Sequence, residues 1–547
     1  MTRPATPETT TPLRRAELLL PAGDLEKLRT AVLYGADAIY AGTPDLSLRT
    51  QSGFGIPELR EGIAFAHEHG KRVYLTLNLF SHNKDVERLP GFVATLREIG
   101  PDGVIVADLG VFEYLREHAP ELELHVSTQA NAVSWLTVRS WQRLGAALCV
   151  LAREVSFAEL REIRERCPDI RLETFVHGSM CMTYSGRCLL SNYMAERGAN
   201  QGSCAHSCRW KYKLKVQAPD GSLGTIDIDQ DNMNEFRFFL EEEFRPGQLY
   251  PIEEDASGSY ILNSRDLCLM PKLDEYLSCG LDSLKVEGRN KSAYYVAVVG
   301  RAYRLAIDAY YENPAAFDPA PYLAELATVA SRGYTIGFHG GRLDSTGHDY
   351  SGGQSLSDFE FAGLVREQDD QGLVVEVRNR LLPGDVLEFL PPARLDCVRL
   401  RLYEYESAET GELKQAVTAG EGRAIRVPWS AFHAEDIASL RALLPNRTVV
   451  RKAKALNEQQ HEQLRQNRES QRFELGLIPA EALGSARSAR PAGGPIKPPR
   501  LGAEGCCGLG CNGCLPFWND EKYEKARTRL LDSRRPKLER GEAASAE

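Results

Sequence analysis

The chain has 547 residues and a formal net charge of −10, with 43% hydrophobic and 26% charged residues. Its length and ordinary composition predict a globular protein of two to four domains. No apolar run approaches the roughly 20 residues needed to cross a bilayer, and the start of the chain has no signal-peptide core. We therefore expect a cytoplasmic protein without a membrane partner. The acidic balance argues against a protein that coats nucleic acid, but it leaves room for a local basic patch that binds RNA.

Residues 1–15 are predicted to be disordered, and residues 16–350 alternate apolar runs with amphipathic stretches. Each run is mostly apolar and ends in polar or small residues, as parallel strands buried on both faces do. The eight runs are 16–23, 37–42, 72–78, 103–108, 124–131, 148–154, 171–178 and 283–289. Stretches between them, such as 24–35 and 109–120, repeat apolar residues at three- and four-residue steps and are predicted helices.

Eight strand–helix units in sequence predict an α/β fold, a (β/α)₈ TIM-like barrel. An open doubly wound sheet is the alternative. Against it, GADAIYAG (35–42) lacks the glycine spacing of a dinucleotide-binding turn. The seventh and eighth strands are separated by an insertion of about 100 residues, 179–282, which is far longer than an ordinary connection. Since barrel active sites lie at the carboxyl ends of the strands, we expect this insertion to be functional.

Residues 355–455 contain alternating runs separated by Gly, Pro and Asp turns, and they predict a small antiparallel β-barrel domain. Residues 456–483 form a polar segment that favours helix. Residues 484–504 are rich in Gly, Pro, Ser and Ala and are predicted to be a flexible linker. The tail, residues 505–547, combines the motif CCGLGCNGC with a mixed-charge helix.

Four cysteines of the insertion form the most informative pattern. Cys181, Cys188, Cys204 and Cys208 are separated by six, fifteen and three residues. Four thiolates in so short a segment can hold an iron–sulfur cluster, and the irregular spacing favours this over zinc, which usually takes two short knuckles. Zinc and unmetallated buried cysteines remain alternatives. Cys268 is an alternative ligand or a packing residue.

The tail motif supplies a candidate second metal or cluster site, Cys506, Cys507, Cys511 and Cys514. The alternative is a flexible, thiol-rich tail. The isolated cysteines are expected to be core or surface residues; they are Cys149, Cys167, Cys279 and Cys397.

Several long motifs resemble the collagenase-like peptidases of family U32 over roughly residues 16–455. They are ELLLPAGDLEKLRTAVLYGADAIYAG, HVSTQANAVSW, FVHGSMCMTYSGRCLLSNY, GSCAHSCRWKY and SLKVEGR. The resemblance implies a barrel followed by a small β-domain. It also implies an iron–sulfur cluster of the 4Fe-4S type after strand seven, held by Cys181, Cys188, Cys204 and Cys208.

Within that family, QANAVSW followed by TVRSW is most similar to the branch that makes 5-hydroxyuridine at the tRNA wobble position by a prephenate-dependent route. The implied partners are tRNA, a small-molecule hydroxyl donor and an electron-transfer or accessory protein. Alternatives are a peptidase, a hydroxylase of another RNA or of a small aromatic substrate, and a non-catalytic protein that delivers sulfur or electrons. The sequence lacks the H-E-x-x-H and G-x-S-x-G motifs of common hydrolases.

Polar residues at strand ends are the candidate active-site residues. His177, Glu287 and Arg289 are candidate catalytic residues, for proton transfer and for binding an anion such as prephenate. A packing histidine and a structural ion pair are the alternatives. Candidate substrate-binding residues are Asn78, Gln129, Asn131, Arg153 and Arg187. Asp108 and Glu154 also end strands. Beside the cysteines, Arg209, Trp210 and Lys211 are placed to contact RNA or to screen the cluster.

Overall fold

The computed structural model describes residues 15–42, 54–78, 81–180, 264–341 and 357–468, the last range with short gaps at 421–422, 459, 463 and 466–467. It also describes Tyr184 and five short strands between residues 215 and 260. The predicted linker and cysteine-rich tail lie outside the described residues. The chain divides into two compact units, one of residues 1–211 and 262–480 and the other of residues 212–261 and 481–547.

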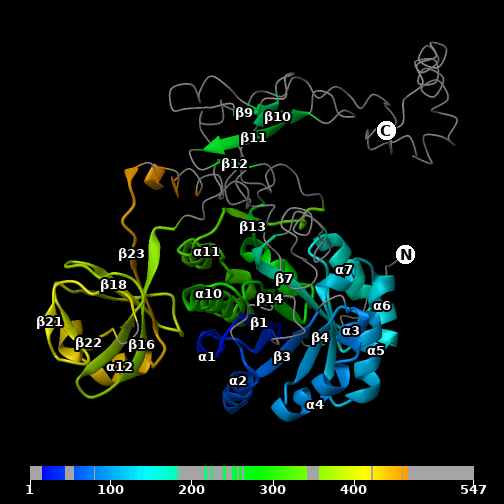
Figure 1. The fold of residues 1–547 in the computed structure, drawn as a ribbon, viewed down its shortest axis with the longest axis horizontal. Coiled ribbons are helices and arrows are strands. Elements are labelled where there is room, and N and C mark those ends of the chain that lie inside the picture. Colours follow the sequence, from blue (N-terminus) through cyan, green and yellow to red (C-terminus); the bar gives the residue numbers. More distant parts are fainter. Residues whose placement is uncertain are drawn as a thin grey trace, which may run out of the picture. The chain divides into compact units, whose positions relative to one another are not determined.

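Eight parallel strands form the centre of the larger unit (Figure 1). They are β1 (Glu17–Ala22), β2 (Ala38–Gly42), β3 (Arg72–Leu77), β4 (Gly103–Val106), β5 (Glu123–Val126), β6 (Leu148–Val150), β7 (Arg171–Ser179) and β14 (Ser283–Val286). Each strand pairs with the next, and β14 pairs with both β7 and β1, so the sheet closes. The predicted barrel is therefore confirmed, and the open-sheet alternative is wrong.

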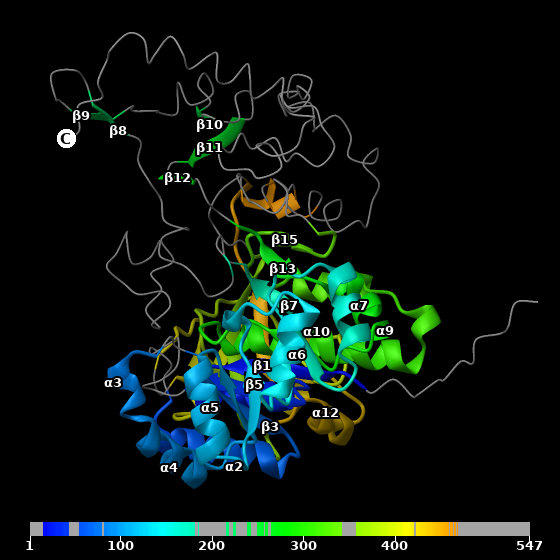
Figure 2. The same ribbon diagram turned by 90° about the vertical axis from the view of Figure 1, so that its right-hand side faces the viewer.

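Helices cover the outside of this barrel, and Figure 2 shows α5, α6 and α7 beside strands β5 and β7. The helices are α1 (Leu25–Leu33), α2 (Ile56–Glu68), α3 (Asn83–Val86), α4 (Leu89–Ile99), α5 (Leu109–His118), α6 (Trp135–Arg143), α7 (Phe157–Arg166), α9 (Leu273–Ser278) and α10 (Ala293–Glu312). Many begin at a side chain that accepts a hydrogen bond from a backbone N–H of the first turn. Asp24, Asp108, Ser134, Ser156 and Ser292 act in this way.

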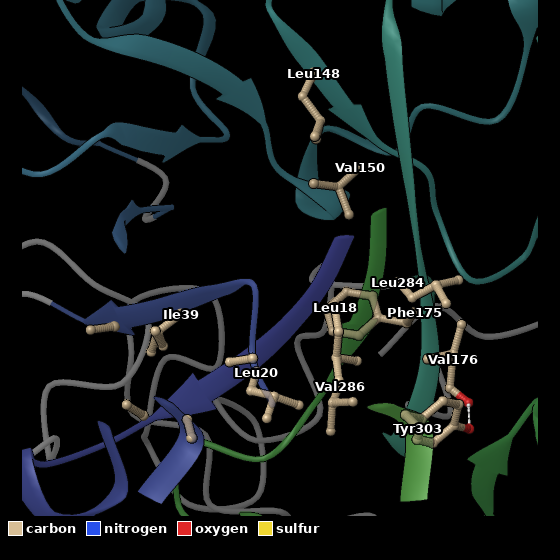
Figure 3. Packing of buried hydrophobic residues seen from close by; sticks show 14 of the residues in the cluster. Leu18, Leu20, Ile39, Leu148, Val150, Phe175, Val176, Leu284, Val286 and Tyr303 are labelled. Atoms are coloured by element: carbon tan, nitrogen blue, oxygen red, sulfur yellow. Dashed lines mark hydrogen bonds between the residues drawn. The ribbon is translucent and has the colours of Figure 1, made fainter. Parts of the chain in front are cut away.

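The alternation of each strand divides its side chains between the helices and the barrel interior. On β1, Leu18 and Leu20 belong to the main core between strands and helices, whereas Leu19 belongs to an interior cluster with Tyr40 and Tyr74. Figure 3 shows the main core around β1, β7 and β14, where the Tyr303 hydroxyl of α10 donates to the carbonyl of Val176 at 2.8 Å. The apolar runs of the sequence thus serve two separate layers.

The insertion after β7 leaves and returns at the carboxyl end of the barrel. Its last residues form β13 (Asp266–Cys268), which pairs antiparallel with β7, and β15 (Tyr334–Thr335) pairs parallel with β13. The hydroxyl of Ser264 donates to the carbonyl of Met180 at 3.1 Å. Both ends of the segment between residues 180 and 264 are therefore held together at one point.

The smaller unit contains five described strands of the insertion. β8 (Lys215–Gln217) pairs antiparallel with β9 (Leu223–Thr225). β10 (Phe238–Glu241), β11 (Leu249–Asp255) and β12 (Gly258–Tyr260) form a second antiparallel sheet in that order.

A second antiparallel domain follows the barrel in the larger unit, as predicted. Its sheet has the order β19-β18-β23-β16-β17-β22-β20-β21 and forms a half-barrel. The strands are β16 (Phe359–Gln368), β17 (Gly372–Val377), β18 (Val386–Leu390), β19 (Val398–Arg401), β20 (Tyr405–Ser407), β21 (Leu413–Lys414), β22 (Ala424–Pro428) and β23 (Val449–Ala453). A short helix, α12 (Ile437–Leu443), packs on it, and the described residues of 458–468 are helical.

Buried polar contacts join the β-domain to the barrel. The hydroxyl of Tyr34, which follows α1, donates to the carbonyl of Leu390 at 2.8 Å and accepts from the backbone N–H of Val449 at 2.8 Å. Beside it, Arg301 of α10 contacts Glu325 of α11 (Ala320–Leu326), and this carboxylate also contacts Arg451 of β23. Among the described helices, none is long and apolar enough to cross a membrane.

Candidate functional site

Charged and aromatic side chains gather inside the barrel toward the carboxyl ends of its strands. They come from five strands or the residues that follow them, and contacts between their side chains join them into one group, which we call the mouth cluster. It consists of Tyr40, Thr76, Arg153, Glu173, Phe175, Lys285 and Arg289. The cluster occupies the part of a (β/α)₈ barrel in which active sites lie.

A buried ion pair forms the floor of the mouth cluster. Lys285 Nζ lies 2.8 Å from Glu173 Oε1, and the two side chains are 5% and 0% exposed. The hydroxyl of Ser283 donates to the second oxygen of Glu173 at 2.7 Å, so both carboxylate oxygens have partners. Burial lowers the pKa of Lys285, which Arg289 and Arg153 lower further, while Glu173 opposes the shift. The ammonium is thus held by a single carboxylate.

Two arginines extend the positive charge toward the mouth. The guanidinium carbon of Arg153 lies 3.9 Å from the ring centre of Phe175, a stacking distance. Arg289 donates from Nη1 to the hydroxyl of Thr76 at 2.7 Å and lies 5.9 Å from the ring of Tyr40. Lys285 lies between the two rings, 4.6 Å from that of Tyr40 and 5.5 Å from that of Phe175. Three cations and two aromatic faces are therefore brought together, an arrangement suited to binding an anion.

Glu287 is fixed to the end of β7, at the point where the insertion begins. Its Oε2 accepts from the backbone N–H of Ser179 at 3.1 Å, and its own carbonyl accepts from the hydroxyl of Tyr295 at 2.8 Å. The close approach needs a glycine, because a Cβ on Gly178, whose φ is +113°, would stand 2.7 Å from the Cβ of Glu287. The structure thus links this candidate residue to the cysteine-bearing segment.

His177 does not point into the mouth cluster. Its ring lies among those of Tyr295, Tyr303 and Tyr334, with centres 6.0, 5.7 and 5.2 Å away, and the residue is 1% exposed. A register shift between β7 and β14 explains this, because one extra residue on β7 reverses the alternation of its side chains. Burial lowers the pKa of His177 to about 4, so its imidazole is neutral near pH 7. The geometry favours the packing alternative, and its role in proton transfer stays a prediction.

The other candidate substrate-binding residues lie around the rim. Gln129 is 3% exposed in a single 3₁₀ turn, η1 (Thr128–Ala130), and its Oε1 has no hydrogen-bond partner within the described ranges. Asn131 ends that turn with φ 51°, and Asn78 follows β3 half-buried. Asp108 caps α5 by accepting from the N–H of Val111 at 3.0 Å. Arg187, Arg209, Trp210 and Lys211 lie outside the described residues.

The predicted cluster ligands Cys181, Cys188, Cys204 and Cys208, and the tail cysteines Cys506, Cys507, Cys511 and Cys514, also lie outside the described residues. In the part of the chain that the structure describes, no group of three or more His, Cys, Asp or Glu side chains is placed to hold a metal ion. The described ends of the cysteine segment meet at the carboxyl end of β7, since the carbonyl of Met180, directly before Cys181, accepts from the hydroxyl of Ser264.

Cys268, the alternative ligand, is fully buried and pairs with His177 across the β13–β7 ladder. Burial raises the pKa of its thiol to about 12, so without a metal it stays protonated. Of the isolated cysteines, Cys149 and Cys167 are buried, while Cys279 and Cys397 are half-buried.

Sequence reasoning named Arg153, Glu287 and Arg289 but missed Tyr40, Glu173, Phe175 and Lys285. The signal was present in the alternation. In SLKVEGR, Lys285 and Glu287 are two residues apart, and in RLETFVHG the same holds for Glu173 and Phe175, so each pair shares a face of its strand. Taken alone, Lys285 and Glu173 read as polar interruptions of buried strands.

An eight-stranded βα barrel with charged groups at the carboxyl ends of its strands has the architecture in which barrel enzymes place their active sites. The chain belongs to Peptidase family U32, whose model matches residues 23–349.

Curated relatives extend the similarity over most of the chain. It is 38% identical over 437 residues to tRNA hydroxylation protein P of Escherichia coli (strain K12), covering 76% of this chain and 94% of that protein. It is 37% identical to tRNA hydroxylation protein P1 of Bacillus subtilis (strain 168), covering 69% of this chain and 84% of that protein. A 23S rRNA 5-hydroxycytidine synthase of Escherichia coli is 31% identical, covering 55% of this chain and 40% of that protein. A solved U32 peptidase structure covers 52% of this chain and 98% of that one, with 16% identity and a TM-score of 0.32.

Proposed function

We propose that this protein hydroxylates RNA, and specifically the wobble uridine of tRNA to 5-hydroxyuridine, with prephenate as the hydroxyl donor. The observation that carries the proposal is the 38% identity to tRNA hydroxylation protein P over 94% of that protein's length. The similarity to a 23S rRNA 5-hydroxycytidine synthase supports the same class of reaction, since its name also describes a hydroxylated pyrimidine in RNA.

The proposed cofactor is an iron–sulfur cluster of the 4Fe-4S type held by Cys181, Cys188, Cys204 and Cys208. The donor set is four thiolates, and the described ends of their segment lie beside Glu287 and Ser179. When bound, such a cluster supplies single electrons. Cys268 is the alternative fourth ligand, because it lies on the strand that returns from this segment.

The chain's own residues bind and orient the reactants in this proposal. Lys285 and Arg289 provide fixed positive charge inside the barrel, where few water molecules compete. Glu173 holds Lys285 in place through their ion pair. Glu287, tied to Ser179, couples the position of the cysteine segment to the mouth cluster.

A peptidase is the second candidate, because the family carries that name. Nothing in the mouth cluster resembles a hydrolase site. The hydroxyl of Ser283 donates to Glu173, but that carboxylate also binds Lys285, and the ring of His177 lies among those of Tyr303 and Tyr334 in the outer layer. We therefore rank the hydroxylase first.

The test is expression in an Escherichia coli strain that lacks its own tRNA hydroxylation protein P, followed by mass spectrometry of tRNA nucleosides. We expect 5-hydroxyuridine derivatives to rise above the empty-vector level. C181S combined with C188S should abolish the rise, whereas C149S, a buried cysteine far from the insertion in the sequence, should retain it. An unchanged nucleoside profile with soluble protein present would reject the proposed RNA reaction.

The cofactor has its own test. Anaerobically purified protein should be brown, absorb near the 400 nm region and contain iron and sulfide in about equal amounts. Colourless protein with one zinc ion would show a zinc site instead. Comparing C208S with C268S then identifies the fourth ligand, since only the true ligand's loss should lower the iron content.

A further inference from the structure

Arg153, which follows β6, is a cation without a counter-ion among the described residues. In the described part of the chain its guanidinium has no ion pair or hydrogen bond, and its one contact is the face of Phe175 at 3.9 Å. A guanidinium that stacks through its flat face still has its N–H groups directed outward in its plane. Its edge is therefore available to an acceptor that is not part of the described protein.

Two further cations, Lys285 and Arg289, lie near Arg153. Arg153 and Arg289 both lower the pKa of Lys285, which shows that the three charges act on one another. Glu173 neutralises Lys285 from below, and its two oxygens already accept from Lys285 and Ser283. Like charges held together at a barrel mouth attract an anion, and their mutual repulsion is relieved when it binds.

The burial of the site favours a small anion. Lys285 and Arg289 are 4% and 5% exposed, and Tyr40 and Phe175 stand beside them with 5% and 7% exposure. A phosphodiester of RNA carries a sugar on each side and cannot insert its oxygens so deeply. A terminal carboxylate can, and the two aromatic rings then contact the apolar body of the molecule that carries it.

We propose that Arg153, together with Lys285 and Arg289, forms a binding site for the carboxylate of a small organic acid, with Phe175 and Tyr40 against its carbon skeleton. The inference rests on the proposed function in one respect, namely that this acid is the hydroxyl donor. It adds the residues that recognise the donor and assigns Arg153 a direct, bidentate contact with the carboxylate.

The experiment is calorimetric titration of the anaerobically purified full-length protein with prephenate. R153Q removes the charge and the fork of N–H groups, so we expect its dissociation constant to rise at least about tenfold. R153K keeps the charge but not the fork and should fall in between. The matched control is R139Q, because Arg139 also stacks on an aromatic ring, that of Trp135 at 4.8 Å, but on the outside of the barrel.

A second titration uses phenylpyruvate, which lacks the ring carboxylate of prephenate. The unaltered protein is compared with R153Q on both ligands. If the unaltered protein binds phenylpyruvate more weakly than prephenate, and R153Q binds the two with equal affinity, Arg153 contacts the ring carboxylate. Equal loss of both ligands would assign it to the side-chain carboxylate. Either result supports the site.

Three results would overturn it. One is R153Q binding prephenate within twofold of the unaltered protein. Another is no prephenate binding to the unaltered protein. The last is a loss of tRNA affinity in R153Q with prephenate binding intact, which would show a phosphate contact. Failure of the proposed function is a separate result: prephenate binding that depends on Arg153, without hydroxylated uridine in the nucleoside assay, leaves the site standing and rejects the RNA reaction.

Discussion

Two charge clusters of the larger unit differ in how their cations are paired with carboxylates. The interface cluster, between barrel and β-domain, consists of Arg301, Glu325, Glu388 and Arg451. Arg301 lies 2.5 Å from Glu325, and Arg451 lies 3.2 Å from Glu325 and 2.8 Å from Glu388. Each of its guanidinium groups thus contacts a carboxylate.

The mouth cluster differs because Arg153 has only an aromatic partner among the described residues. Removing one partner of a buried, paired charge leaves the other charge uncompensated, whereas replacing a charge that has no counter-ion breaks no ion pair. The two clusters therefore differ in how far the fold depends on their charges. This difference predicts that equivalent substitutions will affect stability very differently in the two places.

The largest effect is expected at the interface cluster. E325Q keeps the volume of the side chain but leaves two buried guanidinium groups, those of Arg301 and Arg451, without their shared carboxylate. We expect a loss of roughly 3–5 kcal/mol in the free energy of unfolding, measured by chemical denaturation. The control is E61Q, whose partner Arg29 is near the surface and whose own side chain is 54% exposed. It should cost less than about 1 kcal/mol. Equal losses in the two variants would contradict the assignment of Glu325.

A second buried carboxyl group, that of Glu17 at the start of β1, is expected to make the free energy of unfolding depend on pH. Burial raises the pKa of Glu17 to about 7, which outweighs the attraction of Arg72. Between pH 4.5 and 7 the folded protein therefore binds a proton that the unfolded chain has lost, so this contribution to stability falls as the pH rises through 7.

E17Q, neutral at every pH, should remove this dependence. The difference in unfolding free energy between E17Q and the unaltered protein should grow by up to about 3 kcal/mol from pH 4.5 to 8 in favour of E17Q. Denaturation curves at four pH values measure it. A difference that does not change with pH would mean that Glu17 is ionised throughout.

The sequence was sufficient to predict the barrel because its signal is repeated eight times. Each strand carries its own apolar run, and local alternation determines which side chains face inward. His177 shows where such reasoning stops. Strict alternation along β7 places it with Glu173 and Phe175, but an extra residue opposite β14 turns its ring outward toward Tyr303. A bulge of this kind depends on the pairing of two strands that lie about 100 residues apart in the chain.

The counter-ions of the mouth cluster were unpredictable for the same reason. Lys285 and Glu173 are separated by more than 100 positions, and only the pairing of β7 with β14 brings them to 2.8 Å. Arg153, Glu287 and Arg289 were found because they end their strands, which is a local property. The ion pairs of the interface cluster join barrel helices to the β-domain and leave no local signal.

A smaller effect on stability is expected from the backbone beneath Glu287. G178A places a Cβ 2.7 Å from that of Glu287 at a φ of +113°. We expect a loss of about 1–3 kcal/mol in unfolding free energy, together with displacement of Glu287 from Ser179. The matched control is G70A, because Gly70 also has a positive φ, +67°, but no atom within 4 Å of the added Cβ. If G70A loses less unfolding free energy than G178A, the difference measures the crowding against Glu287. Equal losses in the two variants would attribute the whole loss to the positive φ.

The smallest effect on stability is expected where the effect on binding is largest. R153Q removes a cation that has no carboxylate partner among the described residues and that repels Lys285. The loss of its contact with Phe175 and the relief of that repulsion oppose each other, so the free energy of unfolding should change by less than about 0.5 kcal/mol. The denaturation midpoint measures this, and raising the salt concentration should bring the two proteins closer, since screening weakens the repulsion. A loss comparable to that of E325Q would place Arg153 among the residues that hold the fold, and the distinction between the two clusters would fail at its most informative residue.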